Sequence, residues 1–495
     1  MRKLRNILCR TNAVFDRKGW AVNMRILIIG AGRVGCMLAE SLSSEKHDVT
    51  IVDSDLDPSA GALDNLDVML IRGGGASFSA LRSAGAGNAD VVVAVTRNDE
   101  VNMLSCITSK KLGAKYSIAR IRDPEYARDA ELFMNQLNID FVINPERSTA
   151  AEILRLLRIP AAVEVDTFFR GRVEIVGLRV TTDDVIIGEF LKDLRKRVKA
   201  QILFCVVERD GEVFIPRGDF VIMGGDLVYF AGKYADVTKL LRIMGRETGM
   251  VENAMILGGN RAAYYLSMLA AKIGIKPVIV EADERKCERI AEDVPQATVI
   301  CGDGTEPELL ESENIRLMDA FVALTDSDEE NLMLSLFANR CGVRKVVAMA
   351  NRLDYVPLVS SLGVDSVISP LVITASHILH FVRGLSASRG GKIISLHRLL
   401  DGRVEALEFE VGSDMPYLEA KIKEMPIRQD VMIAVISSGG NSMVPDGDAV
   451  IKKGDRVVVV TTHTGFDELN DIFTRVDKPY VPDETLPFNI NYLRE

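Results

Sequence analysis

The chain contains two copies of one pattern, and this duplication constrains its fold more than any other feature. The segment RILIIGAGRVG at 25–35 returns as AMILGGNRAA at 254–263. The segment VVVAVTRNDEVNMLS at 91–105 returns as FVALTDSDEENLMLS at 321–335. Matched segments keep their order, and their offset stays between 225 and 230 residues. So constant an offset over so long a span indicates a tandem duplication, and we expect the two halves to share one fold.

Within each copy, short apolar segments alternate with helical stretches. In the first copy these segments are RILIIG, DVTIVD, DVMLI, DVVVAVT, SIARI and DFVIN. Their near-continuous apolar character is typical of strands buried on both faces, and their alternation with helices indicates βαβ units in a parallel sheet. The sequence therefore predicts an α/β chain with two Rossmann-like, doubly wound parallel-sheet domains, at 24–146 and 252–375.

A different kind of segment follows each Rossmann-like domain. The stretches VEIVGLRV, AQILFCVVERDGEVFIP and DLVYFAG are rich in strand-forming residues, with turn signals at 209–211 and 224–226. We expect small α+β modules dominated by hairpins at 162–245 and 390–475. One end is a basic extension at 1–23, interpreted as frayed, with a weak membrane-surface contact as the alternative. The other is a Pro-rich tail at 476–495, interpreted as extended or disordered.

Composition narrows the classes of function. The 495-residue chain has a formal net charge of −10, which argues against nucleic acid as a partner because phosphate binding needs clustered Lys and Arg. Its seven cysteines are scattered without a C-x-x-C pair, as is typical of reduced thiols rather than of a disulfide framework. His377 and His380 lie three positions apart, but a metal site would need more ligands nearby. No apolar run is long enough for a membrane helix.

The first copy opens on a glycine-rich loop of the dinucleotide-binding type. The segment after the first predicted strand fits G-x-G-x-x-G, and a carboxylate, Asp53, ends the next strand. In such loops the first glycine allows a tight turn, the second admits the pyrophosphate, and the third allows close helix–strand packing. A carboxylate at Asp53 would bind the ribose hydroxyls and repel a 2′-phosphate, which favours NAD over NADP. The predicted phosphate-binding residues are Gly30, Ala31, Gly32, Arg33, Val34 and Gly35.

The second copy has a changed loop. Asn260 stands where the first copy has Gly32, and Ala263 where it has Gly35, while Glu281 still supplies a carboxylate for the ribose. A side chain at 260 would crowd the path of the pyrophosphate. We therefore expect weaker binding, a different adenine nucleotide, or no ligand at this loop. Its predicted binding residues are Gly258, Gly259, Asn260, Arg261, Ala262 and Glu281.

Two further motifs give the chain a family resemblance. They are AVTRNDEVN at 94–102 and ARIRDPEY at 119–126. Together with the duplication, they make residues 24 to about 475 resemble the TrkA family of regulatory subunits of Trk potassium uptake systems, in which each unit is an RCK module with an N part and a C part. The resemblance implies a homotetramer in the cytoplasm, docked on the inner face of the membrane against a TrkH- or TrkG-like potassium transporter. It also implies NAD(H), or ATP and ADP, as ligands that bias the gate.

The resemblance also implies site residues beyond the glycine loop. Thr96 and Arg97, at the end of the fourth strand, would lie by the adenine and ribose, and Arg120 would reach the phosphates. In the second copy Asp326 replaces the arginine at 97, and Met349 replaces the arginine at 120. This loss of positive charge again predicts a weaker or different second site.

Enzyme activity is the main alternative to regulation. A dehydrogenase needs a general acid or base beside the cofactor, and His397 has no acidic partner evident in the sequence, so we predict no catalytic residue. The carboxylates Asp99, Glu100, Asp328 and Glu329 follow predicted strands and are interpreted as N-terminal caps of the next helices, with a divalent-ion site between units as the alternative. Two alternative functions stay open: an NAD-dependent oxidoreductase, and an RCK-type regulator of a different cation transporter.

Overall fold

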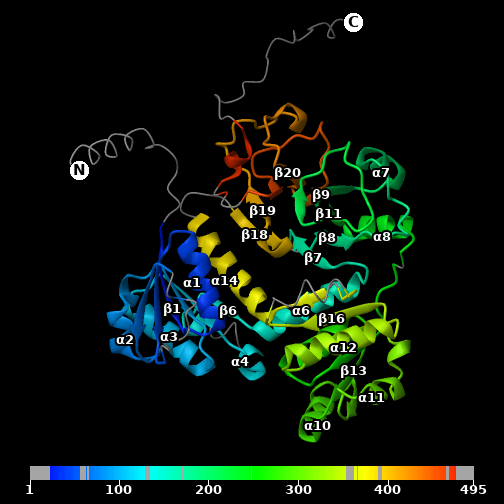
Figure 1. The fold of residues 1–495 in the computed structure, drawn as a ribbon. Coiled ribbons are helices and arrows are strands. Elements are labelled where there is room, and N and C mark those ends of the chain that lie inside the picture. The colour runs from blue at the N-terminus through cyan, green and yellow to red at the C-terminus, as the bar shows by residue number, and fades with distance from the viewer. Residues whose placement is uncertain are drawn as a thin grey trace, which may run out of the picture.

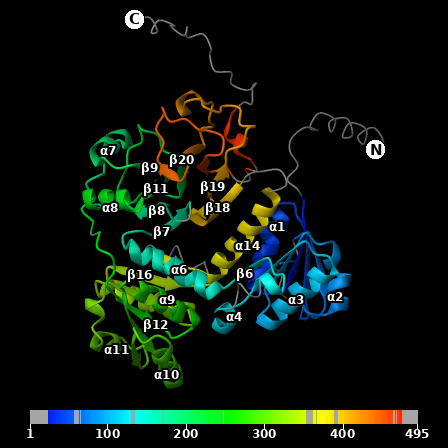
Figure 2. The same ribbon diagram turned by 180° about the vertical axis from the view of Figure 1, so that it is seen from behind.

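The structure is a computed structural model. It describes residues 23–55, 63, 66–128, 134–169, 171–246, 248–352, 362–364, 366–387, 393–463, 466 and 468–474. The predictions for the basic extension and for the Pro-rich tail fall outside these residues, apart from the end of the extension at 23. Figures 1 and 2 show two helix-covered sheets to either side, with two further sheets together at one end of the molecule.

The first half begins with the predicted parallel sheet. Its six strands lie in the order β3-β2-β1-β4-β5-β6, and every pairing is parallel. This is the doubly wound order, in which ligands bind at the carboxyl ends of the strands where β1 and β4 diverge. The elements are β1 Arg25–Ile29, α1 Arg33–Ser44, β2 Asp48–Asp53, β3 Val68–Arg72, α2 Phe78–Ser83, β4 Val91–Ala94, α3 Asp99–Leu112, β5 Tyr116–Arg120, α4 Pro124–Arg128 and β6 Phe141–Ile143.

The second half repeats this sheet, as the duplication predicts. Its order is β14-β13-β12-β15-β16-β17, again all parallel. The predicted fold class is therefore confirmed for both copies. The elements are β12 Asn253–Leu257, α9 Arg261–Lys272, β13 Lys276–Glu281, α10 Glu284–Asp293, β14 Thr298–Cys301, α11 Pro307–Ser312, β15 Ala320–Ala323, α12 Asp328–Arg340, β16 Lys345–Met349 and β17 Ser366–Ile368.

Each parallel sheet is followed by a five-stranded antiparallel sheet, which confirms the hairpin-rich modules. The orders are β10-β9-β11-β8-β7 and β18-β19-β22-β20-β21. Asp210 and Gly211, in the predicted turn between β9 and β10, both have positive φ, as a tight hairpin turn requires. Strand β7 was not predicted. The elements are β7 Glu164–Phe168, β8 Val173–Arg179, α7 Leu191–Val198, β9 Ile202–Arg209, β10 Glu212–Phe214, β11 Leu227–Gly232, α8 Tyr234–Ile243, β18 Ile393–Leu399, β19 Val404–Glu410, β20 Val431–Ser438, β21 Asn441–Met443 and β22 Arg456–Thr461.

Two helices exchange partners between the halves. Helix α6 (Pro145–Arg158) leaves the first parallel sheet and packs on α9 of the second, where Ile153 joins the buried core. Helix α14 (Pro370–Ala387) leaves the second sheet and packs on α1 of the first, where Ile378 and Val382 are buried. Both views show α14 beside α1 (Figures 1 and 2). The predicted domain ranges left most of both helices between domains, although these helices join the two halves.

The two antiparallel sheets meet across an approximate twofold relation. Arg172 donates to the Gly440 carbonyl oxygen at 2.6 Å, and Arg403, which takes the corresponding place in the second copy, donates to the Gly211 carbonyl oxygen at 2.8 Å. A shared apolar core lies between the sheets. Such reciprocal contacts are typical of an interface between two copies of one surface.

The same interface corrects the prediction for His397. Its Nδ1 lies 2.7 Å from Oδ1 of Asp166, so this histidine does have an acidic partner. The sequence could not show the pair because Asp166 comes from β7, 231 positions away, and occupies the equivalent place in the first copy. The dyad lies in the contact between the two antiparallel sheets, with the ring of His397 against that of Phe168. It is part of that interface and does not belong to either glycine loop.

None of the helices in the described ranges combines the length and the apolar character that a bilayer span requires.

Candidate functional site

The first glycine loop joins β1 to α1 at the carboxyl edge of the sheet. Gly30 has φ of +110°, a conformation that side chains rarely allow, and a Cβ at Gly35 would overlap the carbonyl oxygen of Gly30. The fold itself therefore requires both of these glycines, whether or not a ligand binds.

Gly32 is different. Its backbone is extended, and a Cβ built there meets no atom within 4 Å. Gly32 is also the N-cap of α1, and it offers no side-chain acceptor to the N–H groups of the first turn. Nothing within the described chain requires glycine at this place. The open space in front of a helix N-terminus is what a pyrophosphate would fill.

Asp53 lies where the sequence predicted, at the end of β2 beside the loop. Its Oδ2 accepts a hydrogen bond from the Ala31 amide at 2.6 Å, and its Oδ1 accepts one from the Asp55 amide at 2.9 Å. Asp53 is half-buried. The carboxylate is thus fixed at the edge of the loop, in the place where a ribose would be held.

A buried asparagine organises the end of β4, and sequence reasoning did not single it out. Asn102 on α3 is fully buried, and its Oδ1 accepts from the amide of Thr96 at 2.8 Å and from its hydroxyl at 2.7 Å. Its Nδ2 donates to the carbonyl oxygens of Thr96 and Arg120. One side chain therefore ties the ends of β4 and β5 together. The signal was in the motif AVTRNDEVN, which ends at this residue.

Arg120, the last residue of β5, places a cation at the same edge of the sheet. Its Nη2 donates to the Thr96 carbonyl oxygen at 2.6 Å, whereas its Nε is buried and has no hydrogen-bond partner. Burial lowers the pKa of this guanidinium, and the nearby Arg122 lowers it further. The carboxylates of Glu146 and Asp99 lie near enough to oppose this lowering. Arg97, in contrast, is exposed at the end of β4.

The carboxylates after β4 and β15 correct another prediction. The side chains that cap α3 and α12 are those of Asn98 and Ser327. Asp99 and Asp328 lie in the first turns of these helices but reach across to the next loop. Oδ2 of Asp99 accepts from the amides of Arg122 and Asp123, both at 2.8 Å, and Asp328 accepts in the same way from the amides of residues 351 and 352. They hold loops rather than cap their own helices.

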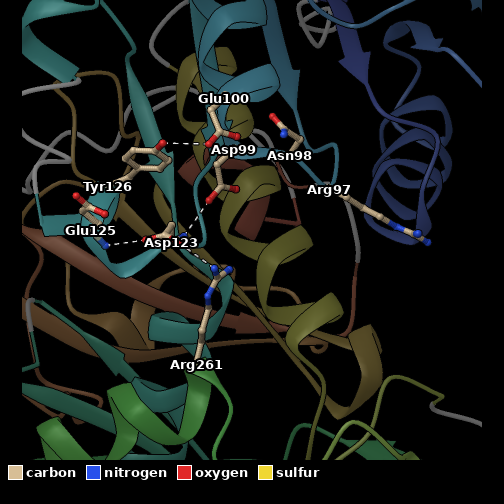
Figure 3. A pocket seen from close by; sticks show the side chains of 8 residues that line it. All are labelled: Arg97, Asn98, Asp99, Glu100, Asp123, Glu125, Tyr126 and Arg261. Carbon is tan, nitrogen blue, oxygen red and sulfur yellow. Dashed lines mark hydrogen bonds and ion pairs between the residues drawn. The ribbon is translucent and has the colours of Figure 1, made fainter. Parts of the chain in front are cut away.

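A polar pocket of about 230 Å³ lies beside these loops. Figure 3 shows that Arg261 of the second glycine loop reaches into it from the other half of the chain, toward Asp123. The two side chains form an ion pair of 2.9 Å. The predicted phosphate contact Arg261 is therefore engaged with the first half. The lining residues are Arg97, Asn98, Asp99, Glu100, Asp123, Glu125, Tyr126 and Arg261.

The second glycine loop has the same backbone conformation as the first, but a side chain occupies its N-cap position. Gly258 has φ of +94°, and the Gly259 amide donates to Oε2 of Glu281 at 2.6 Å, as Ala31 does to Asp53. Asn260 occupies the N-cap of α9. Its Oδ1 accepts from the Ala263 amide at 3.1 Å, and its Nδ2 donates to the Leu324 carbonyl oxygen. The side chain thus covers the helix end that is open in the first copy.

The predicted site residues therefore fall into two groups. In the first copy the loop, Asp53, Thr96 and Arg120 converge on one edge of the sheet and offer amides, a carboxylate and a cation. In the second copy the loop and Glu281 converge, but the helix end is capped and Arg261 points elsewhere. The described residues contain no group of three or more His, Cys, Asp or Glu side chains placed to hold a metal ion.

Comparison with known proteins matches both kinds of unit. Residues 26–145 and 254–370 match the TrkA-N domain, and residues 175–245 and 406–474 match the TrkA-C domain. The Trk system potassium uptake protein TrkA homolog of Archaeoglobus fulgidus is 33% identical over 91% of this chain and 100% of its own length. The Trk system potassium uptake protein TrkA of Halomonas elongata is 32% identical over 88% of this chain and 95% of its own.

Solved structures show the same fold at lower identity. The GsuK RCK domain is 18% identical, with a TM-score of 0.58 over 90% of this chain and 93% of its own. The GsuK channel bound to NAD is also 18% identical, with a TM-score of 0.58 over 90% of this chain and 77% of its own.

Proposed function

Because this chain belongs to the TrkA family, we propose that it is a nucleotide-binding regulatory subunit of a potassium uptake system. It would have no catalytic activity of its own. Its ligand would change the relative placement of the two halves and so bias the gate of a membrane transporter. A ligand can shift such an equilibrium only by its differential affinity for the two states.

The observation that carries the proposal is Gly32. The fold explains the other two glycines of the first loop, but it leaves Gly32 unexplained. A site that admits a pyrophosphate explains it, since any side chain there would enter the space before the helix N-terminus. Asp53 and the cation of Arg120 stand on either side of that space in the sheet order, and their charges suit a ribose and a phosphate.

We propose NAD(H) as the ligand of the first unit, with ATP or ADP as competitors for the same loop. Asp53 would accept hydrogen bonds from the ribose hydroxyls, which disfavours a 2′-phosphate. The binding residues would be those of the first loop with Asp53, Thr96, Arg97 and Arg120. The second unit would bind more weakly, because Asn260 covers the end of α9. The GsuK channel bound to NAD, which shares the fold, supports this assignment.

The partner would be a TrkH- or TrkG-like integral-membrane potassium transporter. The chain would assemble as a homotetramer in the cytoplasm, peripheral on the inner face of the membrane. The names of its relatives support a role in potassium uptake. A role beside another cation transporter is the second candidate, and the test is reconstitution: the chain should change K⁺ flux through a co-purified Trk-type transporter in a nucleotide-dependent way.

The binding test is calorimetric titration of the purified chain with NADH, NAD, ATP and ADP. Asp53→Ala removes charged hydrogen bonds worth about 1.5–3 kcal/mol, so affinity at the first unit should fall at least about tenfold. Glu281→Ala is the matched variant, since it removes the equivalent carboxylate from the second unit and should leave the tight site intact. Absence of any binding to the wild type would overturn the proposal. Oxidation of NADH with a 2-hydroxy or 2-amino acid partner would favour the oxidoreductase.

A further inference from the structure

Two cysteines meet beside the second glycine loop. Cys287, on α10, and Cys301, at the end of β14, are both neighbours of Glu281. The Sγ of Cys287 donates to the carbonyl oxygen of Glu281 at 3.2 Å, and Glu281 is the neighbour of Cys301 in the parallel pairing of β13 with β14. Both thiols therefore adjoin the residue whose side chain was predicted to hold a ribose.

The first copy has no thiol at the matching strand position. Arg72 ends β3 there, in register with Asp53, and its Nε donates to the Ser54 carbonyl oxygen at 3.4 Å. Where the first unit has a cation, the second unit has a cysteine, and a second cysteine contacts the strand residue paired with it. The packing of the parallel sheet does not require a thiol at this place, since the first copy forms the same sheet without one.

The two thiols differ in access. Cys301 is exposed, whereas Cys287 is only 7% exposed. Burial raises the pKa of the Cys287 thiol to about 12, and the adjacent Cys301 contributes to the rise. Cys301 is thus the thiol that an oxidant reaches first, and Cys287 is placed to resolve the product.

We propose that Cys287 and Cys301 form a modification site, a reversible disulfide that joins α10 to β14. The oxidant is a low-molecular-weight disulfide. The Cys301 thiolate attacks one of its sulfur atoms, breaks the S–S bond and releases one small thiol. The Cys287 thiolate then attacks Sγ of Cys301 and releases the second. One S–S bond breaks and one forms, and two electrons and two protons pass from the protein thiols to the small thiols.

The disulfide would fix the edge of the second nucleotide loop. It would anchor the first turns of α10 to the strand that flanks Glu281, and Glu281 in turn accepts from the Gly259 amide. This regulatory consequence rests on the proposed function, whereas the disulfide itself does not. Oxidation should therefore alter nucleotide affinity at the second unit and leave the first unit unchanged.

Peptide mapping of the full chain tests the disulfide. The reduced protein is incubated with oxidised glutathione, free thiols are blocked, and peptides are separated without reduction. We expect a linked peptide pair containing Cys287 and Cys301, reversed by dithiothreitol, and hydrogen exchange in α10 slowed at least tenfold. Cys301→Ser and Cys287→Ser should each abolish the pair, while Cys341→Ser, a half-buried cysteine in the same domain, should leave it.

Two results would overturn the proposal. One is that both thiols stay free under conditions that oxidise a reference dithiol. The other is that Cys301 accumulates as a stable mixed disulfide with glutathione, because Cys287 would then fail to resolve it. Failure of the calorimetric titration is a separate outcome: it would overturn the nucleotide assignment, while the mapped peptide pair would still establish the disulfide.

Discussion

The two glycine loops have the same backbone conformation and differ in the residue at the N-terminus of the helix that follows. In the first copy the N-terminus of α1 is open at Gly32, and in the second the side chain of Asn260 caps α9. Two further exchanges, Arg97 to Asp326 and Arg120 to Met349, remove positive charge at the same edge. The buried asparagine after each of these strands, by contrast, is the same in both copies: Asn102 and Asn331 make matching bonds. The two copies thus share this buried asparagine and differ at the positions predicted to meet a ligand.

The largest effect should come from replacing the buried asparagine that the two copies share. Asn102→Ala and Asn331→Ala each leave buried amides and carbonyls without partners, so we expect each to lower the free energy of unfolding by about 3 kcal/mol. Only Asn102→Ala should also weaken NADH binding. Thermal unfolding measures the first effect and calorimetry the second. Unequal destabilisation would show that the hydrogen-bond networks of the two asparagines are not equivalent.

Exchange of the N-cap residues between the two loops tests whether the open N-terminus of α1 binds the nucleotide phosphates. Gly32→Asn should reduce nucleotide affinity at the first unit at least about tenfold, because the side chain occupies the phosphate space, and should change stability by less than about 1 kcal/mol. Asn260→Gly should expose the end of α9 and strengthen binding at the second unit, with a loss of a few tenths of a kcal/mol. Calorimetry with paired melting curves measures both. If Gly32→Asn binds NADH as tightly as the wild type, the open helix end is not the phosphate site.

The arginine under the loop gives an intermediate effect. Arg120→Met imports the residue of the second copy, and we expect about fivefold weaker NADH binding from the loss of one partly screened cation. Stability should change little, because burial already disfavours this charge. The reverse variant, Met349→Arg, serves as the matched comparison. Binding that is insensitive to Arg120→Met would place this cation outside the ligand's reach.

The smallest expected effect is a pH dependence of stability that comes from α14 and not from α6. His380 on α14 accepts from the Leu396 amide at Nδ1, and burial, with His397 and Arg383 nearby, lowers its pKa. The neutral form is therefore favoured in the fold, and its contribution to stability is complete above pH 6.5 and declines as pH falls below that value. We expect a loss of about 1 kcal/mol, one neutral hydrogen bond.

The control for this effect comes from the other helix. The position on α6 that corresponds to His380 is Arg155, which pairs with Glu152 and does not titrate in this range. His380→Asn keeps an acceptor and should reduce the decline when melting is followed between pH 7.5 and 5.5, while His377 and His47, whose pKa values burial also lowers, keep their share. A decline as steep as that of the wild type would assign it to these other groups.

Periodicity and repetition made the sheets predictable. The six apolar segments of the first copy became six strands of one parallel sheet, because strands buried on both faces leave a strong apolar signal. The glycine loop and Asp53 were likewise visible, since both occupy fixed places relative to a strand end. Strand β7 was harder, because its alternating residues 164–168 give only a short pattern at a sheet edge.

Contacts between the halves were not predictable from sequence. The partner of His397 is 231 positions away, and the partner of Arg261 is 138 positions away. No local pattern shows that α14 leaves its own sheet for α1, because its apolar face would suit either sheet. The roles of Asp99 and Asp328 were misread for the same reason: their partners are loop amides more than 20 positions later in the chain.

The exchange of α14 has a consequence for synthesis. The apolar face of α1 stays uncovered until residue 387 has been made, although the strands of its sheet are complete at 143. At about 5–20 residues per second, the nascent first domain waits for tens of seconds with part of its core facing water. A chain stopped near its midpoint would remain in that state. We expect ribosome-bound or truncated first halves to depend on chaperones, whereas the finished chain does not.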